Sequence, residues 1–193
     1  MELTQSDARK LFLKQQGLLR DNEFGRGKNA TNKAIQRLSY VQIDTISVIN
    51  RAHEHVLYNR VANYNPTHLE KLVQQREVFE YWSHAAAFLP FKDFRYSLPV
   101  MKGFGNTRQC DDKLKAEVLA RIRAEGPLQS RDFEDTSGRK RGGWWEWKPA
   151  KRVLEHLFFS GELMVTRREG FQKVFDLTEN VVPSSINTSE PTL

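Results

Sequence analysis

The 193-residue sequence contains a single cysteine, Cys110, and has no long apolar segment. One cysteine excludes a disulfide framework within the chain and fits a reducing compartment. No apolar run approaches the roughly 18 to 20 residues that a membrane-spanning helix requires. The first residues also lack the basic-then-apolar order of a secretory signal. These absences favour a cytoplasmic protein.

The sequence also has no large excess of either charge, because 30 Lys+Arg and 24 Asp+Glu give a formal net charge of only +6. Such a balance permits a polyanionic partner without requiring one. Six of the 30 basic residues crowd into the 14 positions 139–152, namely Arg139, Lys140, Arg141, Lys148, Lys151 and Arg152. We interpret this stretch either as a solvated basic face or as a contact for nucleic acid.

The sequence has five histidines, and the one dense group is His53-Glu54-His55. The surrounding spacing predicts a helix over 48–62, on which side chains two positions apart diverge. No cysteine or further histidine cluster accompanies them to complete a metal site. We therefore expect no metal ion.

The hydrophobic pattern of residues 1–95 predicts a first small domain. Thr4 and Asp7 have the spacing of a capping box ahead of an amphipathic helix. The alternating segment 41–46 predicts a strand, and the aromatic segment 78–90 predicts a two-stranded ribbon. Further helices are expected over 31–38, 48–62 and 67–75, with Thr31 and Thr67 as caps. This order of helices, strand and ribbon resembles a winged-helix unit.

Residues 96–110 contain proline and glycine without a clear period, and we interpret them as a connector. The stretch 111–180 predicts a second unit, with a helix, a short bridge, a helix near Pro149 and a hairpin that turns at 167–170. That plan is a winged helix-turn-helix. A flexible tail or linker is expected over 181–193. The expected fold class is α+β, mainly helical, with tandem winged helix-turn-helix units and small β-hairpin wings.

Two polar residues interrupt the apolar pattern of the first unit. Gln42 and Asp44 lie two positions apart on the expected strand, so both side chains project from one face. Their apolar neighbours Val41 and Ile43 occupy the opposite face. An amide and a carboxylate side by side can hold and polarise one water molecule. The same spacing is common as exposed decoration of edge strands, so it does not identify an enzyme by itself.

The flanks of this pair resemble a known family of enzymes. The segments that carry the resemblance are Leu38–Ile46, Glu80–Ala85, Phe88–Pro90, Asp93–Arg95, Asp7–Arg9, Gln16–Leu18 and Lys151–Leu177. Together they are similar to the AlkZ/YcaQ-like DNA glycosylases over nearly the whole chain. One branch of that family has Gln-aliphatic-Gln as its catalytic motif. The other, YcaQ-like branch has Gln-aliphatic-Asp, as in Gln42-Ile43-Asp44.

This resemblance implies an enzyme that hydrolyses the N-glycosidic bond of N7-alkylated guanine in double-stranded DNA and unhooks interstrand crosslinks. It implies Gln42 and Asp44 as the catalytic residues, which position and activate water without a cofactor or metal ion. His84, Tyr81 and Trp82 are candidates for supporting residues. Such a protein is expected to be a monomer associated with the bacterial nucleoid. Because members of the family continue well beyond this length, we expect the chain to be truncated at its C-terminus.

Basic side chains of the second unit are the candidates for contacting DNA. In a winged helix-turn-helix one helix reads a groove, and the hairpin tip offers cations to phosphates. The candidates are Lys140, Arg141, Lys148, Lys151, Arg152, Arg167 and Arg168. Two alternatives stay open at this point. A non-catalytic DNA-binding regulator would not need Asp44, and a protein-interaction module would show no salt-sensitive affinity for DNA.

Overall fold

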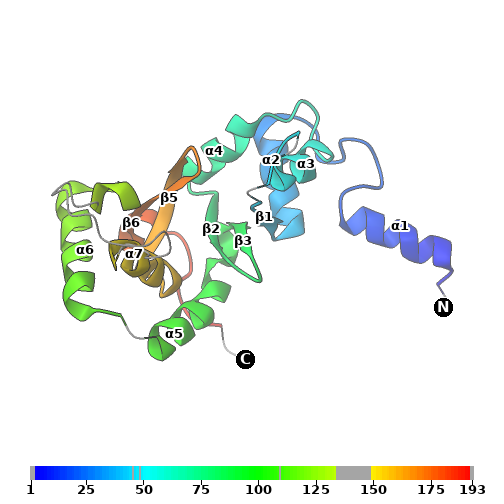
Figure 1. Ribbon diagram of the computed structural model, residues 1–193. Coiled ribbons are helices and arrows are strands. Elements are labelled where there is room, and N and C mark those ends of the chain that lie inside the picture. Colours follow the sequence, from blue (N-terminus) through cyan, green and yellow to red (C-terminus); the bar gives the residue numbers. More distant parts are fainter. Residues whose placement is uncertain (1–2, 45, 48, 109, 134–148, 192–193) are drawn as a thin grey trace. The chain divides into compact units, whose positions relative to one another are not determined.

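A computed structural model describes residues 3–44, 46–47, 49–108, 110–133 and 149–191 (Figure 1). The chain divides into two compact units, Met1–Asp93 and Phe94–Leu193. Of the residues expected to contact DNA, Lys140, Arg141 and Lys148 fall outside the described ones. No helix in the described part of the chain is long and apolar enough to cross a membrane.

The first unit combines short helices with a small antiparallel sheet (Figure 1). Its helices are α1 (Gln5–Gln15), α2 (Gly27–Leu38), α3 (Ala52–Tyr58) and α4 (Pro66–Gln74). Its strands are β1 (Val41–Gln42), β2 (Val78–Trp82) and β3 (Ala86–Pro90), in the sheet order β1-β3-β2. From α2 onward the order is helix, strand, two helices and hairpin, as in a winged helix.

The core of this unit lies between one face of the sheet and the helices α2, α3 and α4. Its buried side chains are Ala30, Ala34, Ile35, Val41, Ile43, Leu57, Val61, Leu69, Leu72, Val73, Val78 and Phe88. The first helix begins with the expected capping box between Thr4 and Asp7, yet it buries no side chain. Strand β1 is therefore fixed by its apolar residues, and α1 takes no part in holding it.

Several helix boundaries in the first unit differ from the sequence prediction because the helices are capped by other residues than expected. Thr31 is buried inside α2, where its hydroxyl donates to the Gly27 carbonyl at 3.2 Å, so it does not cap the helix. Asn65, not Thr67, caps α4, because its side chain accepts from the Thr67 N–H at 2.9 Å and Pro66 follows at the first helical position. The helix expected over 48–62 is the shorter α3.

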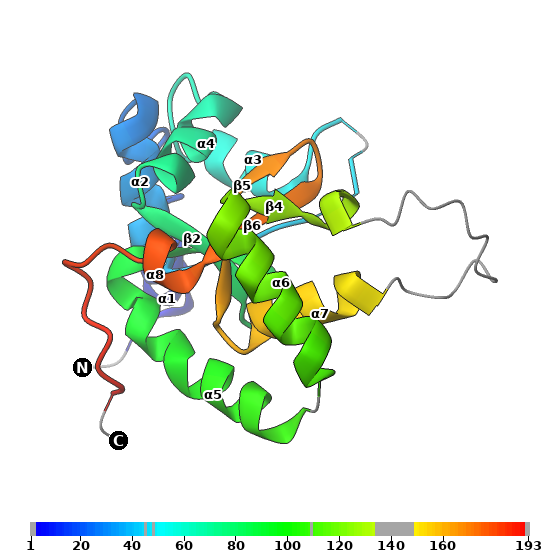
Figure 2. The same ribbon diagram turned by 90° about the vertical axis from the view of Figure 1, so that its left-hand side faces the viewer.

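The second unit repeats this arrangement (Figure 2). The 3-10 helix η1 (Phe91–Ser97) spans the division between the units. The elements that follow are α5 (Leu98–Thr107), α6 (Asp112–Glu125), β4 (Leu128–Gln129), η2 (Ser130–Phe133), α7 (Pro149–Phe159), β5 (Leu163–Glu169), β6 (Gln172–Leu177) and α8 (Thr178–Val181). The sheet order is β4-β6-β5. The α+β class with small antiparallel sheets is confirmed.

The segment expected to be an irregular connector forms the helix α5. Glycines disfavour a helix, but tertiary packing outweighs that preference in α5. The ring of Phe104 lies 5.5 Å from that of His156 and 5.1 Å from that of Phe159, both on α7. A Cβ placed on Gly105 would lie 3.4 Å from the Ser160 side chain, which shows that α5 also packs against the residue that follows α7.

The C-terminal segment and the hairpin turn also differ from the prediction. Glu190 accepts from Arg95 through its carbonyl oxygen at 3.1 Å and forms an ion pair with Lys102 at 3.0 Å, so the expected flexible tail is tied to η1 and α5. The hairpin turns at Gly170, with φ of 60°, because β5 stays paired with β6 as far as Glu169, past a bulge between Val165 and Arg167.

Candidate functional site

The short strand β1 places Gln42 between two core residues. Val41 and Ile43 are 1% and 9% exposed, whereas Gln42 is exposed on the opposite face. Gln42 lies opposite Ala87 of β3, and the Ile43 N–H donates to the Ala86 carbonyl at 2.8 Å. The ladder therefore continues past the two residues of β1. Gln42 therefore projects from the face opposite Val41, and Asp44 follows it by two positions, beyond the end of β1.

The carboxylate of Asp44 lies just beyond β1, where a hydrogen bond from the backbone holds one of its oxygens. Its Oδ1 accepts a hydrogen bond from the Ile46 N–H at 2.9 Å, a turn in which the side chain replaces a backbone acceptor. This turn explains why the strand is shorter than the expected 41–46. Among the described residues no donor is bonded to Oδ2, so this oxygen can accept a proton from a water molecule.

The amide of Gln42 is held by Tyr40, a residue that the sequence did not single out. Ser39 ends α2 with φ of 58° and turns the chain toward β1, directly before Tyr40. The Tyr40 hydroxyl donates to Gln42 Oε1 at 3.1 Å and lies 3.0 Å from Nε2 of His84. The Tyr40 and His84 rings are 4.8 Å apart. The alternation of Tyr40, Gln42 and Asp44 was the available signal for Tyr40.

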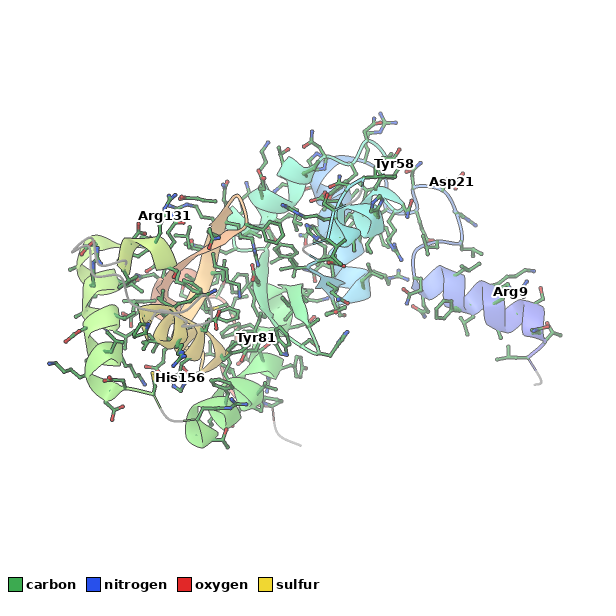
Figure 3. The ribbon with its side chains drawn as sticks, viewed as in Figure 1. Arg9, Asp21, Tyr58, Tyr81, Arg131 and His156 are labelled. Carbon is green, nitrogen blue, oxygen red and sulfur yellow. The ribbon has the colours of Figure 1, made fainter. Side chains whose placement is uncertain are left out.

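Tyr81 and Trp82, the other two supporting candidates, lie on opposite faces of β2. Tyr81 is opposite Ala87, which is itself opposite Gln42, so these three side chains form one row across the sheet. Two strand spacings put Tyr81 about 10 Å from Gln42 along that row. Tyr81, labelled in Figure 3, is buried, and burial raises its pKa to about 12. Trp82 is 44% exposed on the other face, away from Gln42.

The two histidines of the His53-Glu54-His55 group have different surroundings. His53 is buried and meets the ring of Phe88 edge-on at 5.8 Å, whereas Nε2 of His55 lies 3.1 Å from the Asn50 carbonyl. Within the part of the chain that the structure describes, no group of three or more His, Cys, Asp or Glu side chains is placed to hold a metal ion.

Basic side chains of the second unit surround a small cavity between α7, η2 and the hairpin. Its volume is about 170 Å³, and its polar lining comes from Ser130, Lys151, Glu155, Arg168, Gln172 and Lys173. Lys151 and Arg152 are exposed near the beginning of α7. Cations on both walls make this cavity suited to a phosphate group.

The two arginines expected at the hairpin tip lie instead on strand β5. Arg167 donates to Oε1 of Glu169 through Nη2 at 2.7 Å and through Nε at 3.2 Å. Arg168 donates to the Phe171 carbonyl at 2.8 Å and lies over the Phe171 ring, 5.3 Å from its centroid. Both arginines therefore make contacts within the β5–β6 hairpin, and Arg168 also lines the cavity.

Comparison with known proteins gives one family match, to a family described as DNA glycosylase AlkZ-like, over residues 35–192. The matched region begins in α2 and includes β1, the β2–β3 hairpin and all the described elements of the second unit up to α8. No solved structure matches the chain.

Proposed function

The chain belongs to the AlkZ-like DNA glycosylase family, and on that basis we propose that it hydrolyses the N-glycosidic bond of N7-alkylated guanine in duplex DNA. Membership of the family supports a DNA glycosylase role with DNA as the substrate. The finer assignment rests on one observation. Gln42 is exposed on an edge strand whose apolar neighbours Val41 and Ile43 are anchored in the core, and Asp44 follows it by two positions.

The chemistry of the lesion sets a modest demand on the protein. Alkylation at N7 gives guanine a positive charge, so the base leaves as a neutral molecule and needs no strong general acid. When the bond between C1′ and N9 breaks, its electron pair goes to the base and the sugar acquires oxocarbenium character. A carboxylate on the side of the attacking water stabilises that cation.

In this proposal Asp44 is the general base as well as the stabilising charge. The water oxygen forms a bond to C1′ while the carboxylate takes one of its protons. The hydrogen bond from the Ile46 N–H holds Oδ1 and leaves Oδ2 to receive that proton. Gln42 holds the water through its amide. The products are an abasic site and the free alkylated base.

The second unit supplies the electrostatic attraction to DNA in this proposal. Lys151, Arg168 and Lys173 line the cavity and Arg152 is exposed on the same helix as Lys151, and we assign these cations to contacts with phosphates. Unhooking of an interstrand crosslink is the same hydrolysis at one of two linked guanines. A bulky lesion requires an open site, and the exposed position of Gln42 agrees with that requirement.

The proposal is tested by incubating the purified chain with duplex DNA that carries one N7-methylguanine. We expect alkali-labile abasic sites together with free 7-methylguanine, detected by strand cleavage and mass spectrometry. Salt-sensitive duplex binding without abasic sites would show a non-catalytic DNA-binding protein instead. A second duplex with an N7–N7 crosslink tests unhooking, for which we expect separated strands after denaturation.

A further inference from the structure

We propose that Tyr40 is a positioning residue that fixes the orientation of the Gln42 amide, and that His84 holds the Tyr40 hydroxyl in the direction this requires. The inference rests on the proposed function of the same site. In that scheme neither residue contacts the substrate or the water. The proposal states which group donates and which accepts in each of the two hydrogen bonds that join Gln42, Tyr40 and His84.

The chain of hydrogen bonds joins three side chains from two separate parts of the first unit. Tyr40 and Gln42 flank Val41, whereas His84 lies in the turn between β2 and β3, where the Ser83 N–H donates to the Ala85 carbonyl at 3.0 Å. The Tyr40 oxygen is 3.1 Å from Gln42 Oε1 and 3.0 Å from His84 Nε2. Ring contact between Tyr40 and His84, tilted by 32°, supports the same arrangement.

A hydroxyl has one proton to donate, so each hydrogen bond in this series has a defined donor and acceptor. The Tyr40 proton is directed to the oxygen of the Gln42 amide, so the Tyr40 oxygen has lone pairs left to accept a hydrogen bond. Nε2–H of His84 is the donor that completes the chain. Both the neutral Nε2–H tautomer and the protonated imidazole provide this donor.

The direction of the chain determines which end of Gln42 meets the water. With Oε1 occupied by Tyr40, the NH₂ group is the end left to contact the water. It donates to the water oxygen, which then gives a proton to Asp44 and uses its remaining lone pair to attack C1′. A reversed amide would present a second acceptor beside the carboxylate. Without Tyr40 an exposed glutamine amide samples both orientations.

The decisive variant is Tyr40→Phe, which keeps the ring against His84 and removes only the hydroxyl. We expect its single-turnover excision rate constant to fall about 5- to 10-fold, the factor for one neutral hydrogen bond, with unchanged affinity for DNA. Tyr58→Phe is the matched control, because Tyr58 is 67% exposed on α3 of the same unit (labelled in Figure 3). It should excise at the wild-type rate.

Background variants separate positioning from general support of the fold. In a Gln42→Ala background, Tyr40→Phe should cause no further loss, because the amide that it orients is gone. His84→Phe should also slow excision, and the double variant with Tyr40→Phe should be no slower than Tyr40→Phe alone. An equal loss from Tyr40→Phe in both backgrounds would overturn the proposal, since only a structural role predicts it.

An NMR measurement of the Gln42 side chain tests the hydrogen bonds without requiring that the protein be an enzyme. The side-chain NH₂ signals of Gln42 in a ¹H–¹⁵N NMR spectrum, identified by their loss in Gln42→Ala, should shift in Tyr40→Phe and stay in place in Tyr58→Phe. If the wild type excises nothing, the proposed function is wrong and these signals alone decide the inference. A shift then supports the hydrogen-bond chain, and unchanged signals overturn it.

Discussion

Each unit has a glutamine at the equivalent position of its own small sheet, but the two glutamines differ in exposure and in their contacts. In the first, Val41 and Gln42 of β1 lie opposite Phe88 and Ala87, and Gln42 is exposed. The second has Leu128 and Gln129 of β4 opposite Phe175 and Val174, and this glutamine is only 5% exposed. The element order and the strand order of the sheets agree. The backbone arrangement therefore does not account for the difference.

Neighbouring side chains account for it. Nε2 of Gln129 donates to Oε2 of Glu169 on the wing at 2.9 Å, and Arg131, two positions after Gln129, pairs with the same oxygen at 3.2 Å. Hydrogen bonds from Arg167 and Gln129 lower the pKa of Glu169. In the first unit the residue two positions after the glutamine is Asp44, and the Gln42 amide is exposed. The same strand position thus holds a candidate catalytic residue in one unit and a buried residue paired with the hairpin in the other.

Among the tests that compare the two units, the largest effect is expected from removing the two glutamine amides separately. Gln42→Leu should lower the excision rate constant about 10- to 100-fold, because the water loses its positioning group. Gln129→Leu should leave that rate constant unchanged, because its amide only pairs with Glu169. Single-turnover release of 7-methylguanine by each folded variant measures the difference. Equal losses from both substitutions would contradict the distinction between the units.

An intermediate effect, on stability, is expected in the second unit. Glu169→Ala removes the acceptor of the buried Gln129 amide and should lower the Tm by about 3 to 8 °C. Glu117→Ala, at an exposed position on α6, is the control and should leave the Tm almost unchanged. Because the folded-state pKa of Glu169 is lowered, its charge stabilises the fold above the ordinary carboxyl pKa. The difference in Tm should shrink as the pH falls through the folded-state value.

The smallest effect is expected for single cations that we propose contact DNA. Lys151→Ala or Arg152→Ala should weaken duplex binding a few-fold and reduce the slope of log K against log salt by about one each. Lys113→Ala, on α6, is the matched control. Fluorescence anisotropy at a series of salt concentrations measures the slopes. Slopes identical to the wild type in both variants would remove these two residues from the interface.

Most of the fold could be predicted from hydrophobic spacing and turn residues. The capping box of Thr4 and Asp7, the β2–β3 ribbon and the helix that ends at Gly126 all form as expected. The alternation that buries Val41 and Ile43 also exposes Gln42. These features depend on residues close in sequence, which is why periodicity detects them.

The remainder depends on contacts distant in sequence. Tyr40 and His84 are 44 positions apart, and no local pattern pairs them. Helix α5 forms despite its glycines because Phe104 packs on α7. Arg167 and Arg168 pair with Val174 and Lys173 of β6, so they lie on the strand and not at the hairpin tip. Each of these differences results from tertiary packing, to which single-sequence spacing is insensitive.

The central claim is that Asp44 supplies the charge and the base for glycosidic bond hydrolysis, and Asp44→Asn tests it most directly. The substitution keeps the size of the side chain and an acceptor oxygen for the Ile46 N–H, but removes the negative charge. We predict that the single-turnover rate constant for release of 7-methylguanine falls at least about 100-fold while duplex affinity is retained. Asp21→Asn, at an exposed position of the same unit (labelled in Figure 3), should leave the rate unchanged. Excision by Asp44→Asn at the wild-type rate would contradict the account.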